Sequence, residues 1–289
     1  MSKIEKLIYE NERGGRLVFS HRSVYHTVEV TGLSDVRSTI FRASSIGQDG
    51  SSYVGSQIES REIEIVGSIR AQDRDKMREY RRDMNRVLNP KYAATLTYEY
   101  GDFRRIIDCR VENAPVFSRK NILQDFTIQL LCPDPFWREE KAAEDILAGW
   151  IGGFEFPVEP DVEWEAGRKA PLIVNVFNGG NIPAGMVVEF RAKWGVVTNP
   201  SIVNLETGEY IKFKISLSIG DVLTVNTGYS KKDAILTSGD VETNVLKFMD
   251  AGSTFIQLAE GDNLFRCEAG SGADNMEIVV YHNGLYLGV

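Results

Sequence analysis

Two hydrophobic periods follow one another in the first half of the chain. Residues Glu62–Ile69 alternate between apolar and polar side chains, which places three isoleucines on one face and predicts a half-buried strand. Over Gln72–Leu88 the apolar residues recur at spacings of three and four, which predicts an amphipathic helix. The pair Asn89-Pro90 ends this helix, because proline disfavours helical geometry in the residue before it.

Strand patterns resume directly after the helix. Ala94–Tyr100, Arg105–Val111 and Phe126–Leu131 are predicted strands, and the turn pair Gly101-Asp102 predicts a hairpin between the first two. Strands, one helix and then more strands make the N-terminal half an α+β domain. Residues 43–56 are rich in glycine and serine and lack any period, so we expect a long exposed loop there.

The second half combines short strand patterns with turn residues and has no convincing helix. About ten strands at regular spacing are typical of an antiparallel sandwich or barrel. The predicted strands are Leu172–Phe177, Gly185–Ala192, Ser201–Asn204, Tyr210–Ile215, Val222–Asn226, Ala234–Leu236, Asn244–Phe248, Phe255–Leu258, Asn263–Glu268 and Met276–Tyr281. The fold class is therefore mainly β, with an α+β domain followed by an all-β domain.

Composition and charge support a division into two domains. The 289 residues carry a net charge of −8, which splits into +1 for residues 1–140 and −9 for residues 141–289. Two prolines at 133 and 135 end the strands of the first half, and an irregular stretch rich in tryptophan and phenylalanine follows. We expect an N-terminal domain over 1–137, a packed linker over 138–170 and a C-terminal domain over 171–289.

The same composition excludes several classes of protein. An acidic total argues against a general binder of nucleic acid or of anionic membranes. The longest apolar run, residues 146–154, is too short to span a bilayer, and the charged N-terminus does not resemble a signal peptide. Three cysteines without close spacing predict reduced, buried thiols rather than disulfides or a zinc site. A soluble intracellular product is expected.

Motifs for catalysis and cofactor binding are missing from the sequence. It contains no GxSxG, GxGxxG, P-loop, HExxH or CxxC pattern, so we expect no enzyme activity, no cofactor and no metal. His21 and His26 could share a metal in principle, but no carboxylate or cysteine cluster joins them, and partly buried or solvated histidines are the simpler interpretation. His282 stands beside Asn283-Gly284 and is most simply a turn residue.

The predicted helix and the glycine-rich loop are the candidate interaction surfaces. The helix could bind nucleic acid through its arginines, but alternating acidic residues cancel most of the positive field, which favours a solvated or interfacial face. Arginine is enriched at protein interfaces, so subunit contact is the sharper form of that interpretation. The candidate interface residues are Arg78, Arg81, Arg82 and Arg86 on the helix, with Ser45 and Tyr53 in the loop.

Four ordered stretches resemble the distal tail protein (Dit) family of long-tailed bacteriophages, also called the siphovirus tail component family. The first is the strand–helix–strand run from Glu62 through Tyr98, and the second is the junction Cys132-Pro-Asp-Pro-Phe-Trp137. The third is Gly220-Asp-Val-Leu-Thr-Val-Asn-Thr227. The fourth is Phe255–Asn263 followed by Met276–Gly288.

This resemblance implies a structural role in the virion. The N-terminal domain would be a β-rich belt that builds a homohexameric ring, and the C-terminal domain would be a galectin-like β-sandwich outside it. The ring would sit at the tail tip after assembly in the host cytoplasm. Its expected partners are the tail tube protein, the tail-associated hub protein and a receptor-binding protein, while DNA passes through the lumen without specific binding.

A galectin-like fold also raises an alternative function, a carbohydrate-binding module for host adhesion. The sequence departs from the sugar-reading motifs of galectins, because Trp194-Gly195 is followed by Val196-Val197 and no His-x-Asn-Pro-Arg run is present. Fold alone does not carry function. The structural tail adaptor is therefore the first expectation and sugar binding the second.

Overall fold

A computed structural model describes residues 5–118, 123–148, 150–151, 168–169, 173–229 and 231–289. The chain divides into two compact units. Unit 1 comprises Met1–Glu140 together with Tyr286–Val289, and unit 2 comprises Lys141–Leu285. The last four residues therefore belong with the N-terminal unit, and the chain passes between the units twice.

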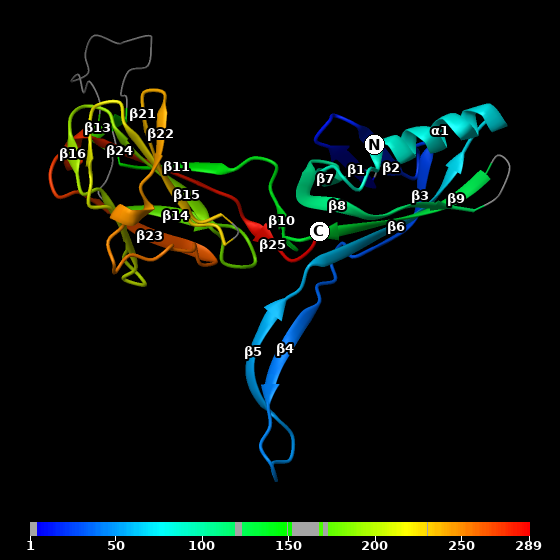
Figure 1. Cartoon of the computed structure of the whole chain (residues 1–289), viewed down its shortest axis with the longest axis horizontal. Helices are drawn as coiled ribbons and strands as arrows, with labels where there is room; N and C mark the ends of the chain where they lie inside the picture. Colours follow the sequence, from blue (N-terminus) through cyan, green and yellow to red (C-terminus); the bar gives the residue numbers. More distant parts are fainter. Residues whose placement is uncertain (1–4, 119–122, 149, 152–167, 170–172, 230) are drawn as a thin grey trace, which may run out of the picture. The chain divides into compact units, whose positions relative to one another are not determined.

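Unit 1 is built on a nine-stranded sheet that closes on itself. The sheet has the order β25-β10-β8-β7-β1-β2-β3-β6-β9, and an additional pairing of β8 with β9 closes it into a barrel (Figure 1). Closure removes the exposed edges that an open sheet would present. The strands of unit 1 are β1 (Glu5–Asn11), β2 (Arg16–Ser20), β3 (Tyr25–Thr31), β4 (Ser38–Ala43), β5 (Ser52–Ile58), β6 (Arg61–Arg70), β7 (Ala94–Tyr100), β8 (Phe103–Phe117), β9 (Leu123–Cys132), β10 (Trp137–Arg138) and β25 (Leu285–Tyr286).

The alternating patterns of unit 1 become strands as predicted. Along β6 the isoleucines face the barrel interior and are buried, while Glu62 on the other face is exposed. The turn at Gly101-Asp102 joins β7 to β8, and Gly101 adopts the left-handed conformation with φ 66°. Burial of these apolar faces, together with Trp137 at the end of the barrel, forms a single core.

The predicted helix is α1 (Arg74–Val87). The Asp73 side chain accepts a hydrogen bond of 2.7 Å from the backbone N–H of Lys76, which caps the first turn. Met77 and Met84 point into the core, where α1 contacts β2, β6 and β8. At the other end, the Asn11 side chain donates a hydrogen bond of 2.9 Å to the carbonyl of Val87, satisfying a backbone group that the helix leaves unpaired.

The predicted loop over 43–56 is only partly a loop. Residues 38–43 and 52–58 form the hairpin β4–β5, and the connection between its strands spans residues 44–51. The prediction failed because serine and glycine are poor strand formers and hide the weak alternation of the few apolar residues. We call residues 38–58 the arm, and Figure 1 shows it extending away from the barrel of unit 1.

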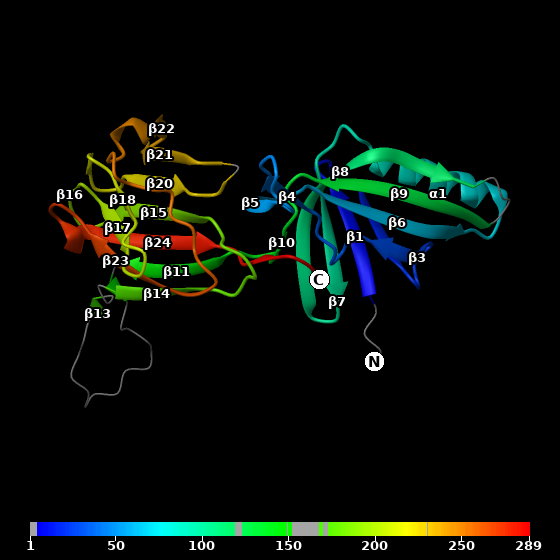
Figure 2. The ribbon, with the colours of Figure 1, turned by 90° about the horizontal axis from the view of Figure 1, so that it is seen from below.

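Unit 2 is a β-sandwich. A six-stranded sheet, in the order β11-β24-β15-β20-β21-β22, packs its inner face on a four-stranded sheet in the order β14-β23-β17-β18 (Figure 2). Two short pairs, β12–β13 and β16–β19, complete its described strands. The bounds are β11 (Ala143–Ala148), β12 (Trp150–Ile151), β13 (Arg168–Lys169), β14 (Ile173–Asn178), β15 (Met186–Ala192), β16 (Val197–Thr198), β17 (Ser201–Asn204), β18 (Tyr210–Lys212), β19 (Ser216–Leu217), β20 (Val222–Asn226), β21 (Asp233–Ser238), β22 (Val241–Asn244), β23 (Gly261–Glu268) and β24 (Met276–His282).

Two predicted strands of unit 2 are wrong. The stretch Asn244–Phe248 contains only the last residue of β22 and a short 3-10 helix, Leu246–Phe248. Residues 255–258 form no strand, although Leu258 makes an isolated bridge to Ala184. In the first stretch a single valine is buried and its neighbours are exposed, whereas the second stretch is buried or half-buried at the edge of the core. Periodicity alone does not separate such segments from strands.

The predicted linker over 138–170 contains a strand of the sandwich. Residues 143–148 form β11, which pairs antiparallel with β24. His282, expected in a turn, is instead buried at the end of β24, where its Nε2 lies 2.9 Å from a carboxylate oxygen of Asp145. Residues 149, 152–167 and 170 of the predicted linker lie outside the described residues, so its expected packing stays a prediction.

Candidate assembly interface

The arm is a two-stranded sheet with every side chain of β4 exposed. Its register pairs Phe41 with Gly55 and Arg42 with Tyr53, with a bulge between these pairs. Arg42 and Tyr53 are directly opposite each other, so a cation and an aromatic ring share one face. Gly47 and Gly50 shape the connection with φ of 85° and 82°, values that other residues rarely adopt.

Large apolar side chains on the arm are left in solvent. Phe41 is 47% exposed, Tyr53 is 67% exposed and Ile46 is fully exposed. Ile40 and Val54 are exposed as well. An isolated hairpin is only marginally stable in water, and these apolar side chains are exposed to solvent. The arm is therefore a candidate contact surface. Ser45 lies in the connection between the strands, as predicted for an exposed position.

The outer face of α1 is charged and largely self-paired. Arg78 lies 3.5 Å from Asp75 and Arg86 lies 2.5 Å from Asp83, both as pairs three residues apart on an exposed surface. Such pairs contribute little to stability. Arg82 is exposed and has no ion-pair partner among the described residues. Of the four helix arginines that were predicted at the interface, Arg82 is the one most available to a partner.

Arg81 packs against the barrel, whereas Arg82 is exposed to solvent. Its guanidinium lies 4.9 Å from the centre of the Phe117 ring, and the side chain is half-buried against β8. A cation over an aromatic face stabilises local packing. The helix residues and the arm residues therefore form two separate surfaces of unit 1, which lie well apart in Figure 1.

A buried arginine fastens the end of the chain to unit 1, and sequence patterns did not reveal it. Arg61 is 3% exposed, and its guanidinium donates to the carbonyls of Gly32 and Pro135, both at 2.7 Å, and to that of Leu287. The Trp137 ring nitrogen donates to a neighbouring carbonyl at 3.0 Å. We call this set of contacts the clasp. Burial lowers the pKa of the Arg61 guanidinium from its ordinary value.

The clasp depends on a turn that needs glycine. Gly32 has φ 84°, and a Cβ there would lie 2.0 Å from a backbone oxygen of Glu62. Further contacts hold the last residues: the Ser34 hydroxyl donates to the Val289 carbonyl at 2.9 Å, and the Tyr286 ring lies 4.0 Å from the Arg105 guanidinium. In the sequence Arg61 is merely the first residue of an alternating strand, so no local signal marks it.

The histidines and cysteines of the described residues were the remaining candidates for a metal or thiol site. The rings of His21 and His26 meet edge to face with centroids 5.5 Å apart, and within the described residues no cluster of three His, Cys, Asp or Glu side chains could hold a metal ion. Burial raises the pKa of the Cys132 and Cys267 thiols to about 12, and that of Cys109 further. No helix among the described residues is long and apolar enough to cross a membrane.

The three thiols are expected to be unreactive in the folded protein. A thiol with a pKa near 12 is almost entirely protonated at pH 8, and burial blocks access to it. Ellman's reagent should therefore detect no thiol in native protein and three after unfolding in guanidinium chloride. Rapid reaction of one or more thiols in the native protein would contradict the burial.

Two family models match the chain in the same order as its two units. A phage tail protein RIFT-related domain matches residues 35–132, and the C-terminal domain of the siphovirus-type tail component matches residues 179–283. The first match lies within unit 1 and includes the arm, α1 and four barrel strands, while the second lies within the sandwich. Together they span well over half of the chain and define it as a structural component of a phage tail.

Solved structures give the same result for the fold. One match is the Dit protein (gp 19.1) of phage SPP1, which is described as a paradigm of the hub adsorption apparatus in phages that infect Gram-positive bacteria. It matches with a TM-score of 0.69 and 12% identity, over 96% of this chain and 98% of that one. A chain of the phage P2 baseplate in its activated conformation with calcium matches with a TM-score of 0.52 and 14% identity over 98% of both chains. A search of curated protein sequences finds no match. The chain belongs to the siphophage distal tail protein (Dit) family.

Proposed function

We propose that this chain forms a homohexameric ring at the distal end of the tail and joins the tail tube to the hub and receptor-binding proteins. The observation that carries the proposal is the arm, whose exposed apolar side chains need a cover that the described part of the chain does not supply. The two matches to families of phage tail components support contacts of the arm within a phage tail. DNA then passes through the lumen of the ring without specific binding.

The distribution of charge suits such a ring. The first 140 residues carry nearly equal numbers of positive and negative groups, so neighbouring copies can pair charges without a large repulsive field. The acidic second half keeps the sandwich soluble on the outside of the ring. Ring assembly takes place in the host cytoplasm, before the tail is complete.

The mass of the full chain in solution tests this function. Size-exclusion chromatography with light scattering, at tens of micromolar protein, should give six times the 32.4 kDa mass of the chain. The ring closes because one surface of each copy contacts a different surface of the next. A monomer at every concentration, together with tail particles that lack this chain, would contradict the proposed ring.

The two adjacent arginines of α1 are expected to separate assembly from stability. Arg82→Glu should leave the unfolding free energy unchanged and raise the concentration needed for assembly at least fivefold, roughly the effect of one charged contact. Arg81→Glu should instead lower the unfolding free energy by about 1 kcal/mol, because it loses the contact with Phe117. Urea denaturation and light scattering of both variants measure the two effects, and an unchanged oligomer with Arg82→Glu would exclude that residue from the interface.

A further inference from the structure

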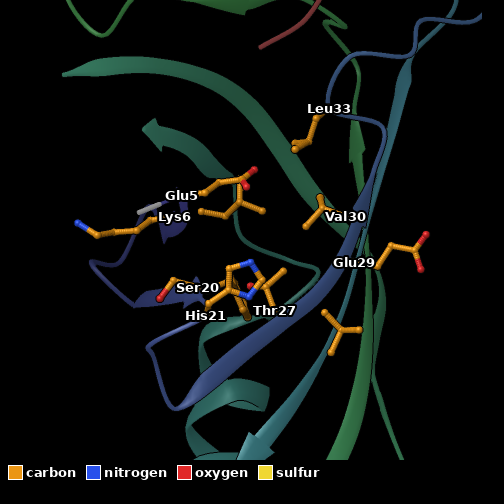
Figure 3. A pocket seen from close by; sticks show the side chains of 11 residues that line it. Glu5, Lys6, Ser20, His21, Thr27, Glu29, Val30 and Leu33 are labelled. Atoms are coloured by element: carbon orange, nitrogen blue, oxygen red, sulfur yellow. The ribbon is translucent and has the colours of Figure 1, made fainter. Parts of the chain in front are cut away.

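The barrel of unit 1 has an opening where one strand ends early. β2 pairs with β3 at only two positions, the last of which is Ser20 with His26. β1 pairs with β2 only from Lys6 onward, whereas β3 continues to Thr31 with β6 on its other edge. A pocket of about 190 Å³ lies in the opening between β1 and β3 (Figure 3).

Part of the wall of this pocket is apolar. Val30 of β3 and Leu33 in the segment after it line the pocket, and Figure 3 shows both side chains directed toward β1. Leu7 and Phe19 also line it, and they are core residues that are at most 2% exposed. A ligand that enters the pocket therefore leaves water for contact with apolar side chains of the barrel.

Two polar groups face the same space. The hydroxyl oxygen of Thr27 is buried and has no hydrogen-bond partner among the described residues, and a bulge puts Thr27 on the same side of β3 as Val30. The carboxylate of Glu5 points from β1 toward that side (Figure 3). The Tyr98 hydroxyl hydrogen-bonds this carboxylate, and burial together with the carboxylate raises the pKa of Tyr98, so the hydroxyl stays a donor.

The charges around the pocket favour a cation. Lys6 points away from the pocket, and its Nζ lies 2.8 Å from a carboxylate oxygen of Glu99. Glu29 points to the opposite face of β3, and His21 completes the polar part of the wall. Glu5 makes no ion pair with any described residue, so its carboxylate is available to a positively charged group in the pocket.

The size of the pocket limits the ligand to one ring and a short substituent. An engineered cavity of roughly 150 Å³ is large enough to bind benzene, so about 190 Å³ holds a six-membered ring with a few further atoms. An aromatic ring suits the apolar wall, and a hydroxyl on that ring would satisfy the buried hydroxyl of Thr27.

We infer that the pocket between β1 and β3 binds a small amine that carries an aromatic ring, with the ring on Val30 and the ammonium group beside Glu5. The inference is independent of the proposed ring of subunits, because every group that it uses belongs to one copy. It assigns to the barrel a ligand site that none of the sequence motifs indicated.

Four related small molecules test the inference on the full chain. Tyramine has the ring, the hydroxyl and the ammonium group, phenethylamine lacks the hydroxyl, 4-ethylphenol lacks the ammonium group, and 3-(4-hydroxyphenyl)propionate carries a carboxylate in its place. Saturation-transfer NMR titrations are made at pH 8, because unperturbed histidines are neutral there. Tyramine should bind with a Kd of about 1 mM or below, about twofold tighter than phenethylamine and about fivefold tighter than 4-ethylphenol, and the propionate should bind weakest.

Variants locate the site within the barrel. Glu5→Gln keeps the size of the side chain and removes its charge, so it should weaken tyramine about fivefold and leave 4-ethylphenol unchanged. Thr27→Val should remove the preference for tyramine over phenethylamine, and Val30→Trp should fill the pocket and abolish binding. Glu29→Gln, which changes the opposite face of β3, is the matched control and should bind all four molecules like the original chain.

Circular dichroism shows which variants are folded, and Glu5→Gln at an exposed position keeps the test valid if Val30→Trp does not fold. No saturation transfer from the chain to tyramine at about 10 mM would overturn the inference, since occupancy would then be negligible. Equal tyramine affinity of Glu5→Gln and Glu29→Gln, or tighter binding of the propionate than of tyramine, would overturn it as well.

Discussion

Arg61→Met will lower the free energy of unfolding of unit 1 by about 3–5 kcal/mol, because several carbonyl groups lose their donor at a cost of about 1–3 kcal/mol each. The methionine fills much of the space but donates no hydrogen bond, so the buried carbonyls of Gly32 and Pro135 and the half-buried carbonyl of Leu287 lose their donor. Urea denaturation followed through Trp137, the only tryptophan of unit 1, measures the loss.

A nearby exposed arginine provides the matched control. Arg37→Met removes a side chain that is 73% exposed and lies 3.4 Å from Glu62, so its effect should stay below about 1 kcal/mol. A chain that ends at Leu285 should be destabilised in the same direction as Arg61→Met, because it lacks the Leu287 carbonyl and the packing of Tyr286. If Arg61→Met changes stability no more than Arg37→Met, the clasp does not hold the fold together.

Removal of the arm is expected to abolish assembly and leave the fold intact. Ser38 and Ile58 are paired residues at its base, so a two-residue Asn-Gly turn can replace residues 39–57 without moving the strands that follow. No residue of the arm contributes to the core, and the melting temperature should change by only a few degrees. Light scattering should then give a monomer at concentrations where the full chain assembles.

The control for this deletion keeps the arm and changes one polar side chain in its connection. Asp49→Ser lies among exposed residues and should assemble like the original chain. Circular dichroism and calorimetry of both variants show whether the barrel is folded. An armless chain that is folded and still hexameric would show that the arm is not the subunit contact.

The periodic elements of the fold were predictable from sequence, and the long-range contacts were not. Alternation of apolar residues identified β6, β7 and β9, and spacings of three and four with a stop at Pro90 identified α1. These signals work because each element buries one face. The strands of the arm bury neither face, so their composition resembled a loop.

The candidate surfaces were predictable only in part. Tyr53 was selected as an exposed residue of a long segment, and it is exposed, but the register that places Arg42 opposite it comes from the hairpin. Four helix arginines looked equivalent in sequence, whereas Arg81 packs on Phe117 and Arg82 is open to solvent. The clasp joins residues 61 and 287 across most of the chain, and no local pattern encodes such a contact.

Electron microscopy of the purified full chain tests the central claim most directly. Class averages of particles viewed down their axis should show closed rings with sixfold symmetry and an open centre. The sandwich units should add density outside the ring. Rings of another symmetry, open filaments, or single particles the size of one chain at concentrations that should favour assembly would contradict the account.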